Sequence, residues 1–200
     1  MKTLKLILFF TFLLNFYCCN EKRETVSKLI NKGVDLVNEN KFDEAIKYYS
    51  KAIKLNPSVQ LAYYDRGIAY TEIKDYSKAL DDFNMVIDLK TNNDVIIEYE
   101  LEDRGQVPYN DALYQRAIVK ANMDSLKSAY NDFQRLIADN YSEKSSCYSW
   151  LGFLFVRSGK LNIACEYFEK ANLSAIIEAD RQNADKMIKA YCQDSASHNK

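Results

Sequence analysis

The chain has 200 residues, 48% of them apolar, with only five glycines and two prolines, a composition that predicts a packed, helix-rich protein rather than a disordered one. Its formal net charge of -1 offers no basic field for a phosphate backbone, so nucleic acid is not an expected partner. The single histidine, His198, lies in a polar stretch near the end of the sequence, which argues against histidine-dependent catalysis and histidine-based metal sites.

The N-terminal segment differs from the rest of the chain. Lys2 and Lys5 precede an apolar stretch at 6–17, Cys18 and Cys19 follow, and the sequence then becomes polar at once. A basic start, about a dozen apolar residues and a sharp polar boundary are typical of a secretory signal, since a membrane span needs about 20 apolar residues.

This segment resembles a bacterial lipoprotein signal, in which the cysteine after the cleavage point becomes lipid-modified. The resemblance implies removal of residues 1–18 and membrane attachment through acyl chains on Cys19. Phe16 and Cys18 depart from the pattern, which usually has leucine three residues before the cysteine and alanine, glycine or serine directly before it. An ordinary signal peptide and an uncleaved membrane anchor are the two alternatives.

Four places in the chain pair an alanine with an aromatic ring four positions later. These pairs are Ala45–Tyr49, Ala79–Phe83, Ala129–Phe133 and Ala164–Phe168. A small residue lies 12 positions before each alanine, namely Gly33, Gly67, Ala117 and Gly152. Both series advance by 34, 50 and 35 residues, and a period near 34 predicts stacked helix–turn–helix units.

The repeats resemble the tetratricopeptide repeat, whose pattern runs W-x₂-L-G-x₂-Y…A-x₃-F…P. The resemblance covers 26–174 and implies an all-α, right-handed α-solenoid of four helical pairs. The four units are expected at about 26–59, 60–93, 110–144 and 145–174. Arg66 and Arg116 depart from the family pattern, because they stand where leucine is usual.

A capping helix is predicted at 175–192, followed by a disordered tail at 193–200. One stripe of this helix is expected to cover the end of the array. The stripe consists of Ile176, Ala179, Asn183, Met187 and Tyr191.

An insertion at 94–109 separates the second and third units and alternates apolar and polar residues as a strand does. One interpretation is a lengthened loop whose apolar side folds onto the neighbouring helices. The other is a partner-binding projection with an acidic edge. Its candidate contact residues are Glu98, Tyr99, Glu100 and Glu102.

In stacked units of this kind the first helix of each pair lines the concave side. The residues expected to form this partner-binding groove are Ile30, Val34, Tyr64, Ile68, Tyr114, Ile118, Phe153 and Arg157. The stripe is mostly apolar, which suits an amphipathic helix or an extended apolar segment better than a terminal carboxylate. The alternative is that part of the stripe is core.

No catalytic, cofactor-binding or metal-binding residues are predicted, and no small-molecule substrate is expected. The acidic pairs Asp81–Asp82 and Glu102–Asp103 are interpreted as solvated surface rather than acid–base dyads. Buried free thiols are the favoured state of the later cysteines, with a Cys165–Cys192 bridge as the alternative.

The sequence therefore predicts a non-enzymatic protein–protein interaction scaffold that is exported and lipid-anchored in a bacterial cell envelope. The expected location is the outer membrane, facing the periplasm or the surface. The expected partner is a protein or peptide held in the groove. The alternatives are an enzyme or enzyme subunit with a site at the insertion, and a cytosolic scaffold with a membrane anchor.

Overall fold

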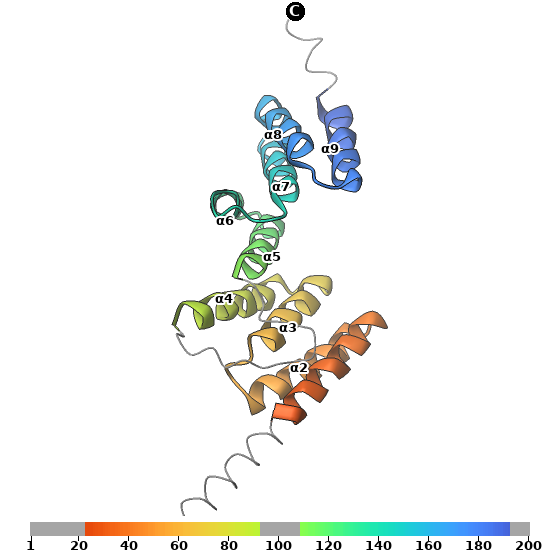
Figure 1. Ribbon diagram of the computed structural model, residues 1–200, viewed down its shortest axis with the longest axis vertical. Coiled ribbons are helices and arrows are strands. Elements are labelled where there is room, and N and C mark those ends of the chain that lie inside the picture. The colour runs from red at the N-terminus through yellow and green to blue at the C-terminus, as the bar shows by residue number, and fades with distance from the viewer. Residues whose placement is uncertain (1–22, 93–108, 193–200) are drawn as a thin grey trace, which may run out of the picture. The chain divides into compact units, whose positions relative to one another are not determined.

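The structure, a computed structural model, describes residues 23–92 and 109–192, and the regular elements within these ranges are all α-helices (Figure 1). The helices fall in two compact units, Met1–Val107 and Pro108–Lys200. Among the described residues, no helix is both long enough and apolar enough to span a membrane.

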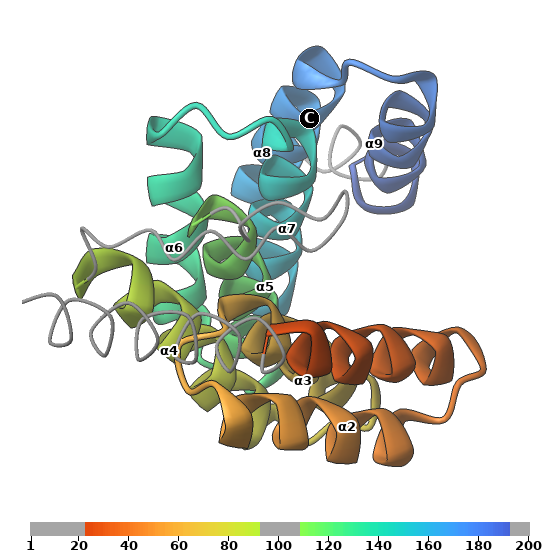
Figure 2. The same cartoon turned by 60° about the horizontal axis from the view of Figure 1, so that its bottom comes forward.

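The first unit contains two helical hairpins (Figure 2). A helix at 23–38 pairs with α2 (Phe42–Leu55), and α3 (Gln60–Glu72) pairs with α4 (Tyr76–Asn92). Pro57 lies in the short connection after α2, where its missing N–H and fixed φ are compatible with the end of a helix.

The second unit contains two further hairpins and one more helix. Its helices are α5 (Tyr109–Asn122), α6 (Leu126–Ala138), α7 (Lys144–Arg157), α8 (Leu161–Ser174) and α9 (Glu178–Tyr191). Helix α8 packs on α7, and α9 lies beside α8 (Figures 1 and 2). Tyr109, expected as the last residue of the insertion, is instead the first residue of α5.

The repeat period is visible in the backbone of the turns inside the hairpins. Asn40, Lys74, Asp124 and Gly159 all have positive φ, between 58° and 73°, and they follow one another at the repeat spacing of 34, 50 and 35 residues. The residue after each of them donates its backbone N–H to a carbonyl five positions earlier, as in Lys41 N to Leu36 O at 2.8 Å. A left-handed residue with this hydrogen bond is how a helix closes its last turn, so the four hairpins share one turn geometry.

In the first, second and fourth repeats, the glycine lies against the ring of the following helix. A Cβ added to Gly33 would lie 2.4 Å from the Tyr49 ring, and one added to Gly152 would lie 2.4 Å from the Phe168 ring. The absence of a side chain at these glycines leaves room for the rings. The aromatic residues of the four repeats are at most 1% exposed, namely Tyr49, Phe83, Phe133 and Phe168. The predicted all-α fold of repeated helical hairpins is confirmed.

Ile30 was expected in the accessible groove, and this prediction is wrong. Its side chain is 0% exposed and belongs to the core of the first unit, together with Val26, Ala45 and Tyr49. The helix at 23–38 presents Val26, Ile30 and Gly33 to the inside of the hairpin, at the spacing of one helical face.

The stripe predicted for the capping helix is also shifted. Ile176 is 82% exposed because it lies in the connection before α9, which begins at Glu178. The residue of α9 that is fully buried is Ala184, and Tyr191 adds a ring that stacks on Phe168 with 5.9 Å between centroids. Ala184 and Tyr191, seven positions apart, therefore set the face of α9 that packs.

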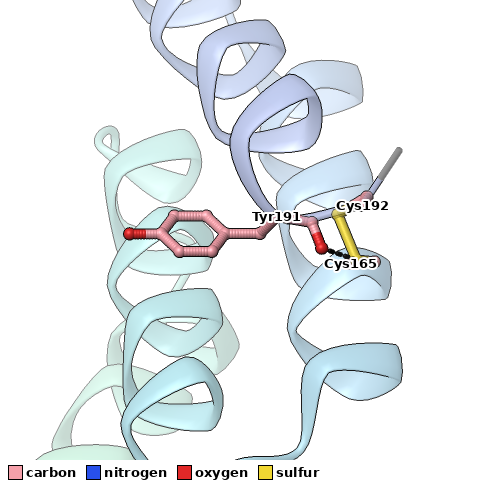
Figure 3. Close-up of a disulfide and its surroundings, with 3 residues drawn as sticks. All are labelled: Cys165, Tyr191 and Cys192. Carbon is pink, nitrogen blue, oxygen red and sulfur yellow. Dashed lines mark hydrogen bonds between the residues drawn. A yellow bond between two sulfur atoms is a disulfide. The ribbon is translucent and has the colours of Figure 1, made fainter. Parts of the chain in front are cut away.

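The favoured state of free thiols is wrong for two of the three later cysteines. Cys165 of α8 and Cys192, directly after α9, form a disulfide with 5.7 Å between their Cα atoms (Figure 3). The Cys165 sulfur also lies 3.8 Å from the carbonyl oxygen of Tyr191. Cys147 is buried and free, and burial together with the charge of Glu143 raises the pKa of its thiol to about 12.

Several predictions fall outside the described residues. These are the signal at 1–18 with the lipidation site Cys19, the insertion residues Glu98, Tyr99, Glu100 and Glu102, and the tail at 193–200. They stay predictions.

Candidate partner-binding surface

A cavity of about 200 Å³ lies in the second unit. Helix α7 supplies most of its wall, with α5 contributing on one side and α9 on the other. The lining residues are Tyr114, Ser145, Ser146, Ser149, Trp150, Phe153, Asp180, Asn183 and Met187. Helices α5 and α7 are the first helices of the third and fourth repeats, so the cavity opens on the side where the groove is predicted.

The rings in the wall rest on the buried rings of the repeats. Tyr114 packs edge-on against Phe133, and Trp150 stacks on the same Phe133 ring, with 6.0 and 6.1 Å between centroids. Phe153 packs edge-on against Phe168 at 5.5 Å. Because Phe133 and Phe168 are fully buried, the wall is held by the hydrophobic core and is formed before any partner binds.

The described polar side chains of the wall are neutral except for one carboxylate. Among the residues that the structure describes, no lysine, arginine or histidine lines the cavity, and Asp180 is the one charged lining residue. Within the described chain, Asp180 forms neither a hydrogen bond nor an ion pair, while the other carboxylates of α9 are occupied: Glu178 by Arg181 and Asp185 by Asn172. Burial raises the pKa of Tyr114, so its hydroxyl stays protonated and can donate or accept a hydrogen bond.

The predicted groove residues of the second unit divide between the cavity and its surroundings. Tyr114 and Phe153 line the cavity, whereas Ile118 is half-buried and outside it. Arg157 is exposed and is occupied by an ion pair with Asp124 and a hydrogen bond to the Ala121 carbonyl. In the first unit, Val34, Tyr64 and Ile68 are half-buried.

Trp150 and Asp180 are among the residues of the wall that the sequence-based prediction missed. Trp150 is the only tryptophan of the chain, and it lies three positions before Phe153 of the predicted groove, which was a usable signal. Asp180 shares a helical face with Asn183 and Met187, at intervals of three and four. That face was assigned to covering the end of the array, and part of it lines the cavity instead.

Arg66 and Arg116, which stand where the repeat pattern usually has leucine, form ion pairs inside their hairpins. Arg66 donates from Nε and Nη2 to both carboxylate oxygens of Asp82, at 2.8 and 2.7 Å, and from Nη1 to Ser50. Asp82 is 4% exposed, so its assignment to a solvated helix face is wrong. It lies on the face of α4 that meets α3, while Asp81 beside it is exposed.

The third repeat contains a larger cluster of the same kind. Arg116 donates to both oxygens of Asp132, at 2.9 and 2.8 Å, and Lys120 donates to the same carboxylate at 2.7 Å. These carboxylates are engaged by cations and are not placed as acid–base pairs. In the part of the chain that the structure describes, no three histidine, cysteine, aspartate or glutamate side chains gather as metal ligands.

Comparison with protein families matches residues 30–94 to the tetratricopeptide repeat. Over 63 residues the chain is 40% identical to the TPR repeat-containing thioredoxin TDX of Oryza sativa subsp. japonica, covering 32% of this chain and 20% of that protein. Over 119 residues it is 26% identical to serine/threonine-protein phosphatase 5 of Rattus norvegicus, covering 60% and 21%. The chain spans about a fifth of the length of these relatives.

Solved structures show the same fold. MamA from Desulfovibrio magneticus RS-1 matches with a TM-score of 0.61 and 16% identity, covering 88% of this chain and 98% of that one. YrrB, described as a TPR protein with an unusual peptide-binding site, matches with a TM-score of 0.57 and 20% identity, covering 92% and 93%. The fold of this chain is the all-α fold of repeated helical hairpins that tetratricopeptide-repeat structures share.

Proposed function

We propose that the chain is a non-enzymatic protein–protein interaction scaffold that holds a segment of a partner protein at the groove of its second unit. The observation that carries this proposal is the preformed cavity between α5, α7 and α9. A concave, ring-lined wall with a few polar groups suits the capture of a side chain from another protein. Peptide binding is described for YrrB, and the proposal extends it to this chain.

We further propose that the protein is exported and lipid-anchored at Cys19 in a bacterial cell envelope. The support is the basic, apolar and cysteine-containing order of residues 1–19. The Cys165–Cys192 disulfide adds to it, because structural disulfides persist mainly in oxidising compartments such as the periplasm. The mass of the mature N-terminus tests this: a diacylglyceryl group on Cys19 supports export and anchoring, and an intact Met1 contradicts them.

The groove is tested by blocking the cavity without removing any packed ring. Ser149→Tyr places a large side chain into the wall, and Ile163→Ala changes a surface position of α8 away from the cavity. Membranes that hold each variant are cross-linked, and the captured proteins are identified by mass spectrometry.

The two variants should then differ. We expect a partner that wild type and Ile163→Ala capture equally to be lost with Ser149→Tyr, while circular dichroism shows that all three are folded. A full set of partners retained by Ser149→Tyr would exclude the cavity as the contact site.

A further inference from the structure

We propose that the cavity of the second unit receives a basic side chain, arginine or lysine, of the partner segment, with Asp180 as its counter-ion. This inference rests on the proposed function, because it specifies the chemistry of the segment that the groove holds.

Charge is the first reason. Of the described residues that line the cavity, one is a carboxylate and none is cationic, so their field favours a cation and opposes a terminal or side-chain carboxylate. Asp180 has no hydrogen-bond or ion-pair partner among the described residues, whereas Glu178 and Asp185 on the same helix are engaged. An incoming cation would therefore form a new ion pair without breaking an existing one.

The aromatic wall is the second reason. Tyr114, Trp150 and Phe153 line the same cavity as Asp180 and are held by the buried rings of Phe133 and Phe168. A guanidinium or ammonium group is attracted to the face of an aromatic ring, most strongly to tryptophan, and guanidinium also stacks on it.

The remaining polar atoms fit the donors of a basic side chain. Ser146, Ser149 and the Asn183 amide line the cavity and provide oxygen acceptors. Arginine and lysine carry only donors at their charged ends, so these acceptors complement them.

Size favours one side chain over a whole small molecule. The cavity volume is about 200 Å³, whereas pockets for drug-sized ligands have about 300–1,000 Å³. The cavity is therefore suited to a single anchoring residue of a longer segment whose remaining contacts lie along the groove.

Trp150 provides a local reporter for the test, since it lines the cavity and is the only tryptophan of the chain. The full chain in detergent is titrated with three capped tripeptides, and tryptophan fluorescence is recorded. The central residue is arginine, its neutral isostere citrulline, or glutamate. We expect a saturable change with the arginine peptide at a concentration about tenfold lower than with citrulline, and none with glutamate.

The Asp180→Asn variant identifies the counter-ion. It should lower the affinity for the arginine peptide about tenfold and leave the citrulline peptide unchanged, because only the charge pair is removed. Glu169→Gln removes one negative charge from the exposed face of α8 and should behave as wild type.

Equal responses to the arginine and citrulline peptides, or no response to arginine, would overturn this inference. The proposed function would survive that result if cross-linking at the cavity still captured a partner. Retention of every partner by the Ser149→Tyr variant would instead overturn the proposed function itself, so the two failures are separable.

Discussion

The hairpins α5–α6 and α7–α8 fill the same repeat positions in two different ways. In α5–α6, Arg116 and Asp132 form a half-buried ion pair that Lys120 joins. Thirty-five residues later, in α7–α8, the same positions hold Leu151, which is fully buried, and Tyr167, whose ring stacks on Phe155 with 5.3 Å between centroids. One backbone frame thus accepts either ionic or apolar contacts between its helices.

This difference determines how each hairpin responds to the loss of a side chain. An ionic cluster with little exposure is stable only when all its members are present, because each removal leaves a charge that water reaches poorly. Contacts between rings and aliphatic side chains do not require every partner to be present in this way. The cavity is built mainly on the apolar hairpin, by α7 together with α9. Among its described lining residues, the carboxylate of Asp180 is not accompanied by a cationic side chain.

The largest expected effect is the loss of the central carboxylate of the ionic hairpin. Asp132→Ala removes the ion-pair partner of Arg116 and Lys120, whose side chains are only 19% and 16% exposed. We expect the free energy of unfolding to fall by about 3–5 kcal/mol, measured by urea denaturation followed by circular dichroism.

The control converts this hairpin to apolar contacts. The triple variant Arg116→Leu, Lys120→Leu and Asp132→Leu should regain most of the stability lost by Asp132→Ala, because no unpaired charge remains. A single variant as stable as wild type, or a triple variant less stable than the single one, would contradict the division of the hairpins into ionic and apolar types.

The next effect concerns the attachment of α9 to the apolar hairpin. This helix has few apolar residues and one fully buried side chain, so the Cys165–Cys192 disulfide carries much of its attachment to α8. Replacing both cysteines by serine should reduce the free energy of unfolding by about 3 kcal/mol, the entropy of closing the 27-residue separation.

Reduction provides the matched measurement for the disulfide. Wild type treated with dithiothreitol should show the stability of the double serine variant, and hydrogen exchange should increase in α9 before it increases in α7. Unchanged exchange in α9 after reduction would mean that Ala184 and Tyr191 alone hold the helix.

Repetition is what made the fold predictable from the sequence. Each of the four hairpins repeats the small residue and the ring, and chain positions such as Gly152 and Phe168 could be matched without knowing any distance. Side-chain pairs that occur in only one or two repeats could not be predicted from the repeat pattern in this way. Asp81 and Asp82 are identical in type, and only Asp82 lies on the face of α4 that meets α3, where it pairs with Arg66.

The candidate site was less predictable, because its walls come from helices that are not paired in one repeat. Tyr114 and Phe153 follow from the stripe of the first helices, but the contribution of α9 depends on how that helix packs. Ala184 is the buried residue of α9, and one of three alanines in a mostly polar helix gives a weak signal. The disulfide likewise requires the 5.7 Å between its Cα atoms, which the sequence does not contain.

A smaller effect distinguishes the glycines of the hairpins. A Cβ at Gly152 would lie 2.4 Å from the Phe168 ring, and one at Gly67 would lie 2.9 Å from the Phe83 ring. Gly152→Ala should therefore cost about 1–2 kcal/mol after the gain in helix propensity, and Gly67→Ala should cost less. Thermal unfolding of the two variants gives this order, and a larger loss at Gly67 would contradict it.

The smallest effect is on Cys147, the free thiol inside the apolar hairpin. Burial raises the pKa of this thiol to about 12, above the value of about 8.5 for an exposed thiol. At a pH between these two values the folded chain keeps the thiol proton and the unfolded chain loses it. The stability that this difference represents is complete below about pH 8 and is lost as the pH rises toward 12. Iodoacetamide should therefore alkylate Cys147 slowly at pH 8.5 in the native chain and rapidly in urea, as read by peptide mass spectrometry. Fast labelling of the native chain at that pH would show that the interior of this hairpin opens to solvent. The apolar hairpin would then be more loosely packed than the structure indicates.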